Sequence, residues 1–102
     1  MLKVELLYFD GCPSYRMAER LLREALAEQG ASAEIAMIQI ADDDDAKRAK
    51  FVGSPTIRID GVDPFRYDEA NDGMECRIYV TPEGLKGWPT KAMLEEVLKR
   101  KT

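Results

Sequence analysis

Two strand-like segments flank one long helix-like segment in the first half of the chain. Leu2–Phe9 alternates at first and then becomes continuously apolar, which is typical of a central strand covered on both faces. Asp10-Gly11 interrupts this run. From Pro13, apolar residues recur at spacings of three and four up to Gly30, which predicts a helix. Ala33–Ala41 is apolar again, so the segments predict two parallel strands joined by a helical crossover.

Four consecutive aspartates, Asp42–Asp45, follow the second predicted strand. Either one of them caps a short helix over Ala46–Phe51, where acidic side chains match the helix dipole, or the run binds a cation. Adjacent aspartates cannot all point at one ion, and the spaced ligands of a calcium loop are absent from the sequence. We therefore predict a solvated turn and a helix cap, and no metal site.

The second half of the chain predicts two more strands and a final helix. Thr56–Asp60 alternates between polar and apolar residues, and Arg77–Val80 is the next strand-like segment. Apolar residues recur with helical spacing after Thr90, a suitable helix cap. The last two strands are expected to pair antiparallel. The prediction for residues 1–102 is one α/β domain, in which helices flank a four-stranded mixed sheet in the order βαβαββα.

The charge and composition of the chain argue against several classes of function. It carries 15 Lys and Arg against 19 Asp and Glu, a net charge of −4, so it has no basic surplus for binding nucleic acid. No apolar run approaches the length of about 18 residues that spans a membrane. Met1–Glu5 lacks the features of a signal peptide, so we expect a cytoplasmic protein without a membrane partner. The absence of histidine excludes catalytic triads and zinc sites that use this residue.

Cys12 is the candidate nucleophile. It lies where the first strand ends and the first helix begins, and there the unpaired N–H groups and the helix dipole favour an anion. A thiolate is such an anion, and it is the nucleophilic form of cysteine. Arg16, one turn later, adds positive charge nearby. The alternative is a buried cysteine that only fills space; a cysteine within a Gly-Cys-Pro turn favours the functional interpretation.

Two segments together resemble the thioredoxin superfamily: Tyr8–Tyr15, which opens a helix, and Val52–Thr56, which opens a strand. The resemblance implies that Cys12 is the nucleophile. It also implies that the Ser54–Pro55 bond is cis, with Pro55 packed beside the sulfur as part of the catalytic site. A groove beside this proline is then expected to bind an extended peptide or glutathione. The implied substrate-binding residues are Pro13, Tyr15, Arg16, Ser54 and Thr56.

The second cysteine of the family's Cys-x-x-Cys motif is missing, because its position is occupied by Tyr15. Three alternatives follow. Cys12 forms a mixed disulfide with glutathione or a protein thiol, as in monothiol glutaredoxins; Cys76 resolves such a mixed disulfide; or the domain is a binding module without redox activity. A simple pairing of the last two strands would place Cys76 about 15 Å from Cys12, too far for a disulfide, unless the segment before it changes the register. No cofactor is expected beyond glutathione as a co-substrate.

Two further segments bear on the choice of substrate. Cys76–Tyr79 and Gly84–Thr90 look like small bacterial thioredoxin-like proteins, some of which carry an organomercurial-lyase-type name. No motif here assigns the aspartate that this lyase chemistry needs, although soft thiolates do bind soft metals. Val62–Glu75 is polar and long for a connection in a small domain. We predict that this loop is mobile and shapes access to Cys12.

Overall fold

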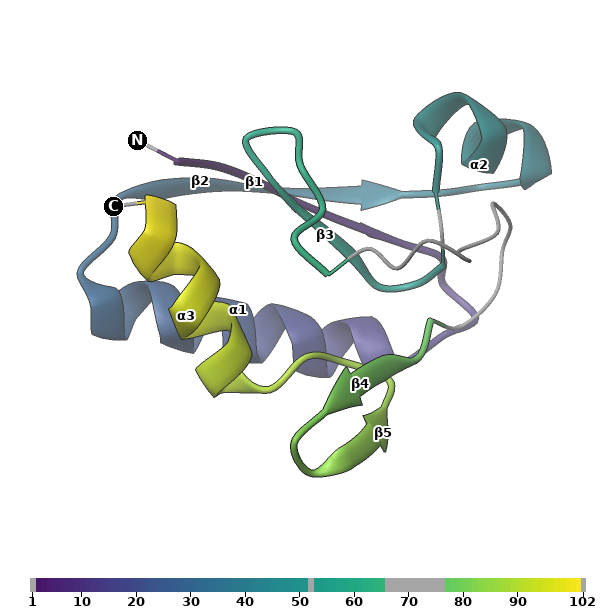
Figure 1. Ribbon diagram of the computed structural model, residues 1–102. Coiled ribbons are helices and arrows are strands. Elements are labelled where there is room, and N and C mark those ends of the chain that lie inside the picture. Colours follow the sequence, from purple (N-terminus) through teal and green to yellow (C-terminus); the bar gives the residue numbers. More distant parts are fainter. Residues whose placement is uncertain (1, 52, 66–76, 102) are drawn as a thin grey trace.

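The computed structural model describes residues 2–51, 53–65 and 77–101, and within them the chain forms three helices and five strands (Figure 1). In chain order these are β1 (Leu2–Tyr8), α1 (Ser14–Gln29), β2 (Ala33–Gln39), α2 (Asp43–Ala49), β3 (Thr56–Ile59), β4 (Tyr79–Thr81), β5 (Gly84–Lys86) and α3 (Lys91–Lys101).

The first three elements form the predicted parallel unit. β1 and β2 pair in parallel, from Leu2 opposite Ala33 to the ends of both strands, and α1 is the crossover between them. Gly30 ends α1 in the left-handed conformation, with φ of 61°, and its N–H closes the last turn. A residue without a Cβ adopts this conformation at the lowest steric penalty, so the predicted helix end is confirmed.

The predicted four-stranded thioredoxin-like sheet is wrong. The main sheet has three strands in the order β2-β1-β3, with β3 antiparallel to β1, and β4 and β5 form a separate two-stranded sheet. β4 turns back locally instead of pairing with β3. Gly84 adopts φ of 107° after the turn, and the Thr81 hydroxyl donates to its carbonyl at 2.6 Å. This tight hairpin gives β4 a partner among its own neighbours in sequence.

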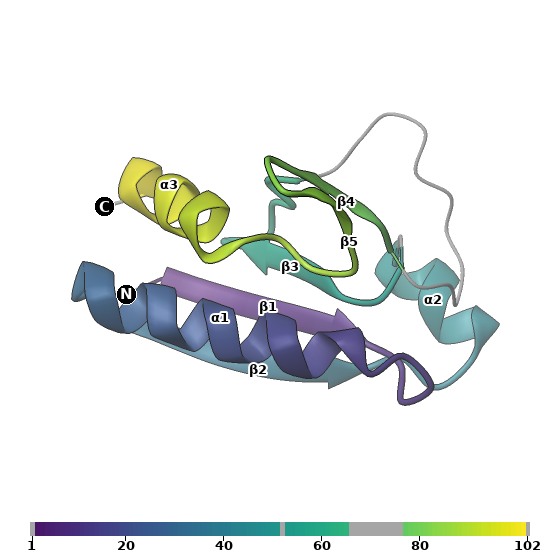
Figure 2. The same cartoon turned by 90° about the horizontal axis from the view of Figure 1, so that it is seen from below.

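The main core lies between the three-stranded sheet and two helices. Figures 1 and 2 show α1 and α3 on the same face of this sheet. Alternate residues of β1 and β3 point into the core, and the helices supply residues at spacings of three and four. The buried cluster comprises Leu2, Val4, Leu6, Ala18, Leu22, Ala25, Leu26, Ile57, Ile59, Phe65, Tyr79, Leu94 and Leu98.

A smaller cluster lies around α2 and contains Leu7, Ile40, Ala46 and Phe51. The predicted aspartate cap is confirmed, because the Asp42 carboxylate accepts a hydrogen bond from the Asp45 N–H at 2.8 Å. The helix itself was predicted over Ala46–Phe51 and begins three residues earlier. The remaining aspartates belong to its first turn, where negative charge is favourable.

Candidate thiol site

Cys12 lies in the turn that joins β1 to α1. Its N–H donates to the Phe9 carbonyl at 3.2 Å, which closes this turn. Pro13 is the N-cap residue of α1, and the Arg16 N–H donates to its carbonyl at 3.2 Å. The first turn of α1 holds no acidic side chain. The positive end of a sixteen-residue helix therefore lies beside Cys12 with no carboxylate of its own first turn to neutralise it.

The sulfur of Cys12 is fully buried, with 0% of the residue exposed. Its thiol donates a hydrogen bond to the Ser54 carbonyl over 3.6 Å, within the range for sulfur. The Ser54 hydroxyl in turn accepts from the Phe9 N–H at 3.4 Å. The Ser54–Pro55 peptide bond is cis, as predicted, and Pro55 is fully buried. The two segments that carry the resemblance thus meet at Ser54.

The other predicted substrate-binding residues are mostly engaged within the protein. Thr56 is buried, and its hydroxyl donates to the Gly53 carbonyl at 2.5 Å. The ring of Tyr15 stacks on Tyr8 with centroids 4.2 Å apart, and the Arg16 guanidinium lies 5.6 Å from the Tyr15 ring. Tyr15 and Arg16 therefore lie in the first turn of α1, whereas Thr56 shapes the turn that holds Ser54.

Cys76 and most of the predicted loop, from residue 66 onward, lie outside the described residues. The distance that separated Cys76 from Cys12 rested on pairing β4 with β3. This pairing is replaced by the β4–β5 hairpin, so that distance has no basis. The start of the loop is described, and Phe65, one of its few apolar residues, is buried in the main core.

A buried ion pair at the start of this loop was not predicted. One Arg77 nitrogen lies 2.6 Å from Asp63 Oδ2 and the other lies 3.4 Å from Oδ1, so the contact is bidentate. The two side chains are only 6% and 7% exposed. The guanidinium also donates to the Phe65 carbonyl and lies 4.4 Å above the Tyr79 ring. These contacts satisfy much of the hydrogen-bonding capacity of a charge that is expensive to bury.

The ion pair is connected to the thiol through the backbone. The Arg77 N–H donates to the Ser54 carbonyl at 2.8 Å, the same oxygen that accepts from the Cys12 thiol. The Tyr79 hydroxyl donates to the next carbonyl, that of Pro55, at 2.5 Å. Only one sequence signal pointed to this arrangement: an arginine in an otherwise apolar strand segment.

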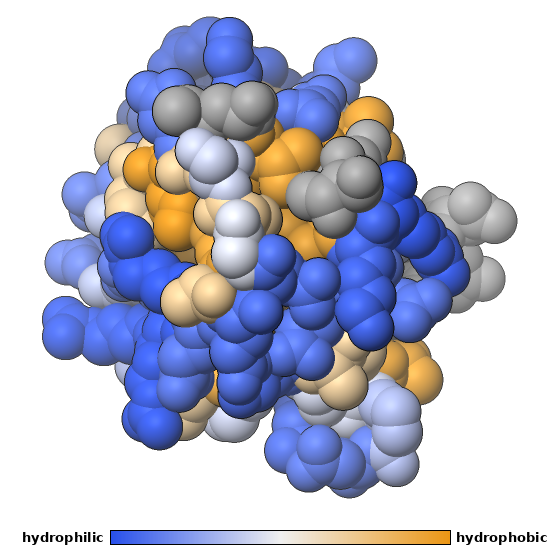
Figure 3. Space-filling view, turned by 90° about the vertical axis from the view of Figure 1, so that its left-hand side faces the viewer, coloured by the Kyte–Doolittle hydropathy of each residue, from blue (hydrophilic) through white to orange (hydrophobic). Residues whose placement is uncertain are grey.

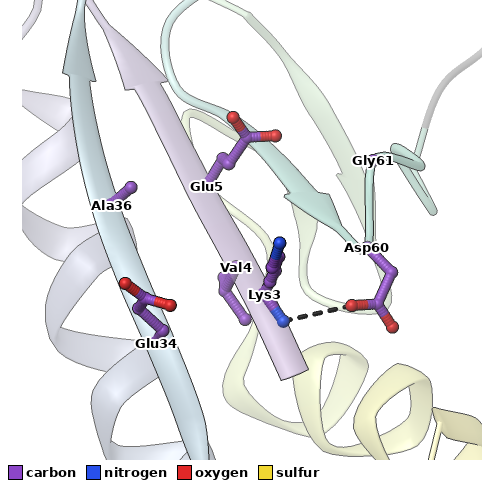
Figure 4. A pocket seen from close by; sticks show the side chains of 7 residues that line it. All are labelled: Lys3, Val4, Glu5, Glu34, Ala36, Asp60 and Gly61. Atoms are coloured by element: carbon purple, nitrogen blue, oxygen red, sulfur yellow. Dashed lines mark hydrogen bonds between the residues drawn. The ribbon is translucent and has the colours of Figure 1, made fainter. Parts of the chain in front are cut away.

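A hollow of about 560 Å³ lies elsewhere, against the face of the sheet that α1 and α3 leave open (Figure 4). Strands β1 and β2 supply Lys3, Glu5 and Glu34 to its lining, and the turn after β3 supplies Asp60. The Lys3 N–H donates to the Asp60 carboxylate at 3.1 Å. None of its lining residues belongs to the thiol site, so it is a separate feature.

At the far end of α1, charges on two helices meet at the surface. Lys91 Nζ of α3 lies 3.0 Å from Glu28 Oε2. A hydrogen bond between Glu28 and Glu95 lowers the pKa of Glu28 and raises the pKa of Glu95, and Lys91 adds to the lowering at Glu28. The carboxylate of Glu28 raises the pKa of Lys91. Hydrophilic side chains dominate the lower half of the end view in Figure 3.

Over residues 2–51, 53–65 and 77–101, no helix combines the length and hydrophobicity needed to cross a bilayer. Over the same part of the chain, no three acidic or cysteine side chains gather in a way that could hold a metal ion.

The chain matches no protein-family model, and no curated protein is significantly similar to it.

Proposed function

We propose that this protein is a monothiol thiol–disulfide oxidoreductase in which Cys12 forms a mixed disulfide with glutathione or a protein thiol. The observation that carries the proposal is the position of Cys12 in the turn directly before α1, where its thiol donates to the Ser54 carbonyl. The proposal takes its chemistry from the resemblance of two short segments and does not depend on a four-stranded sheet. A reducing compartment such as the cytoplasm would supply the glutathione, and no nucleic acid or membrane partner is involved.

The reaction exchanges one disulfide bond for another. The Cys12 thiol releases its proton to solvent, and its sulfur attacks one sulfur of oxidised glutathione. A bond forms between the Cys12 sulfur and that glutathione sulfur while the original disulfide breaks and expels a glutathione thiolate. A second glutathione thiolate then attacks the glutathione sulfur of the mixed disulfide and regenerates the Cys12 thiolate.

The burial of Cys12 sets a condition on this chemistry. A sulfur without exposed surface cannot be attacked or attack in the arrangement described, so the reaction must proceed through a local opening around Ser54. The same burial favours a second candidate function, a binding module in which Cys12 is only a packed side chain. A role in binding soft metals or organomercurials has no observation of its own in favour.

Mass spectrometry of the folded protein after incubation with oxidised glutathione tests the proposal. We expect one glutathione adduct, assigned to Cys12 by peptide mapping. The adduct should persist in Cys76→Ser and disappear in Cys12→Ser, and these two variants are matched controls for each other. An adduct confined to Cys76, or none until urea unfolds the protein, would support the non-catalytic candidate instead.

The lack of a second cysteine three residues after Cys12 predicts little dithiol reductase activity, for example with insulin as the substrate. Turnover that requires Cys76 would identify this residue as the resolving thiol. Turnover that survives Cys76→Ser would contradict the monothiol mechanism, because no other thiol in the chain could close the cycle.

A further inference from the structure

We infer that Asp63 and Arg77 are positioning residues for Cys12: their buried ion pair holds the Ser54 carbonyl against the sulfur and thereby sets how often the thiol becomes accessible. This inference rests on the proposed function, since it concerns the same sulfur. Neither side chain needs to touch the substrate. Both act through the backbone of Ser54.

The connection consists of four consecutive contacts. The Asp63 carboxylate is first fixed by its own segment, because Oδ1 accepts from the Phe65 N–H at 2.9 Å. The carboxylate forms a bidentate contact with the Arg77 guanidinium. The Arg77 main-chain N–H then donates to the Ser54 carbonyl at 2.8 Å, and this carbonyl accepts from the Cys12 thiol at 3.6 Å. Each contact holds the next one in place.

Ser54 is held from a second direction as well. Its hydroxyl accepts from the Phe9 N–H, which follows the end of β1, so the residue joins the β1–α1 turn to the segment before β4. Loss of the hydrogen bond between the Arg77 N–H and the Ser54 carbonyl removes one of these two attachments. The opening that exposes the sulfur should then require less free energy, while the core between the sheet, α1 and α3 keeps its contacts.

The geometry of the ion pair predicts a graded effect of substitution. Asp63→Asn removes the charge partner and leaves the buried guanidinium uncompensated, which weakens the connection most. Arg77→Lys keeps the charge and the main-chain N–H, but a lysine ammonium cannot reproduce the planar bidentate contact. Arg77→Lys should therefore lie between the wild-type protein and Asp63→Asn.

The test measures the rate at which Cys12 forms a mixed disulfide with oxidised glutathione, in Cys76→Ser protein that is otherwise wild type or carries one of these changes. Leu98→Val, in the main core on α3, is the control for a general loss of stability. We expect Asp63→Asn to react at least about tenfold faster than the parent, Arg77→Lys to show a smaller increase, and Leu98→Val to stay within about twofold. If Asp63→Asn does not fold, Arg77→Lys carries the comparison alone.

Hydrogen exchange of the residue 77 amide gives a second readout that a general structural role would not move selectively. This amide should be protected in the parent, lose protection in both ion-pair variants and keep it in Leu98→Val. If the variants react with glutathione no faster than the control, the positioning role is overturned while the proposed function stands. If Cys12 of the parent itself fails to react while folded, the proposed function fails.

Discussion

The two ends of helix α1 differ in how the protein treats polar groups. At the N-terminal end, the Cys12 thiol is buried and the turn after β5 approaches so closely that a Cβ on Gly87 would lie 2.6 Å from the Ser14 hydroxyl oxygen. At the C-terminal end, Glu28 and Lys91 pair across two helices with side chains 52% and 39% exposed. Figure 2 shows the β4–β5 hairpin toward one end of α1 and α3 toward the other.

This difference separates contacts that hold a geometry from contacts that solvent can replace. Buried groups without water must keep their protein partners, so a small displacement at the N-terminal end leaves a donor or a charge unsatisfied. Exposed ions at the C-terminal end are screened and can exchange partners with water. Substitutions should therefore have larger and more specific effects near Ser54 than near Glu28.

The largest effect is expected at the buried ion pair. Arg77→Met removes one partner and leaves Asp63 charged, buried and without its guanidinium, which should lower the free energy of unfolding by about 3–5 kcal/mol. Urea unfolding followed by circular dichroism measures this loss. The double variant Asp63→Leu/Arg77→Met should recover most of it, because two apolar side chains leave no uncompensated charge. If Arg77→Met were as stable as the parent, the Asp63–Arg77 ion pair would not be buried from solvent.

Adding a side chain at Gly87, beside the N-terminal end of α1, should have an intermediate effect on stability. Gly87→Ala places a methyl group against the Ser14 hydroxyl, and overpacking of this kind costs roughly 1–3 kcal/mol. Ser14→Ala removes the oxygen in question and should restore part of the stability in the double variant. Thermal unfolding of the four proteins forms a double-mutant cycle, and purely additive effects would show that the two residues do not approach each other as described.

The exposed end should show a small, pH-dependent effect. Because the pKa of Glu95 is raised in the folded protein, its ionisation opposes folding, and this penalty is absent at acidic pH. Glu95→Gln should raise the melting temperature slightly at neutral pH, with the gain fading as the pH falls below the raised pKa of Glu95. The lowered pKa of Glu28 acts in the opposite sense, because the ionised Glu28 carboxylate stabilises the folded protein at neutral pH and this stabilisation is lost in acid. If the gain in melting temperature grew as the pH fell, the pKa of Glu95 would not be raised in the folded protein.

The smallest effect is expected for Lys91→Met. Because the pKa of Lys91 is raised, the charged lysine stabilises the folded protein at pH values below its ordinary pKa of 10.5. This stabilisation is lost as the pH rises through the raised pKa. The melting temperature should fall only slightly at neutral pH and low salt, and the difference should disappear at high salt. Salt-independent destabilisation would indicate lost packing of the lysine stem instead of a lost charge interaction.

The sequence predicted those parts of the molecule that depend on local patterns. Apolar spacing identified β1, α1 and β2, and a motif identified the turn at Cys12 and the cis bond at Pro55. Strand pairing was the main error, because the partner of β4 is decided by a tight turn at Gly84 that does not show in hydrophobic alternation.

The ion pair escaped prediction for a different reason. Asp63 and Arg77 are 14 residues apart. Arg77 stands out only as an arginine in an apolar strand segment, and Asp63 looks like an ordinary surface charge in the sequence. Their burial follows only from the way Phe65 and Tyr79 pack into the core, with ring centroids 5.8 Å apart. Long-range contacts of this kind depend on the tertiary fold and leave no local pattern.

The urea dependence of the reaction between Cys12 and oxidised glutathione tests whether Cys12 acts as a nucleophile in the folded protein. In Cys76→Ser protein, well below the unfolding transition, a functional thiol exposed by local opening should react at a rate that hardly changes with urea, because a local opening exposes little new surface. A rate that instead rises with urea at the full slope of global unfolding would mean that Cys12 reacts only in the unfolded chain, and this result would contradict its role as a nucleophile.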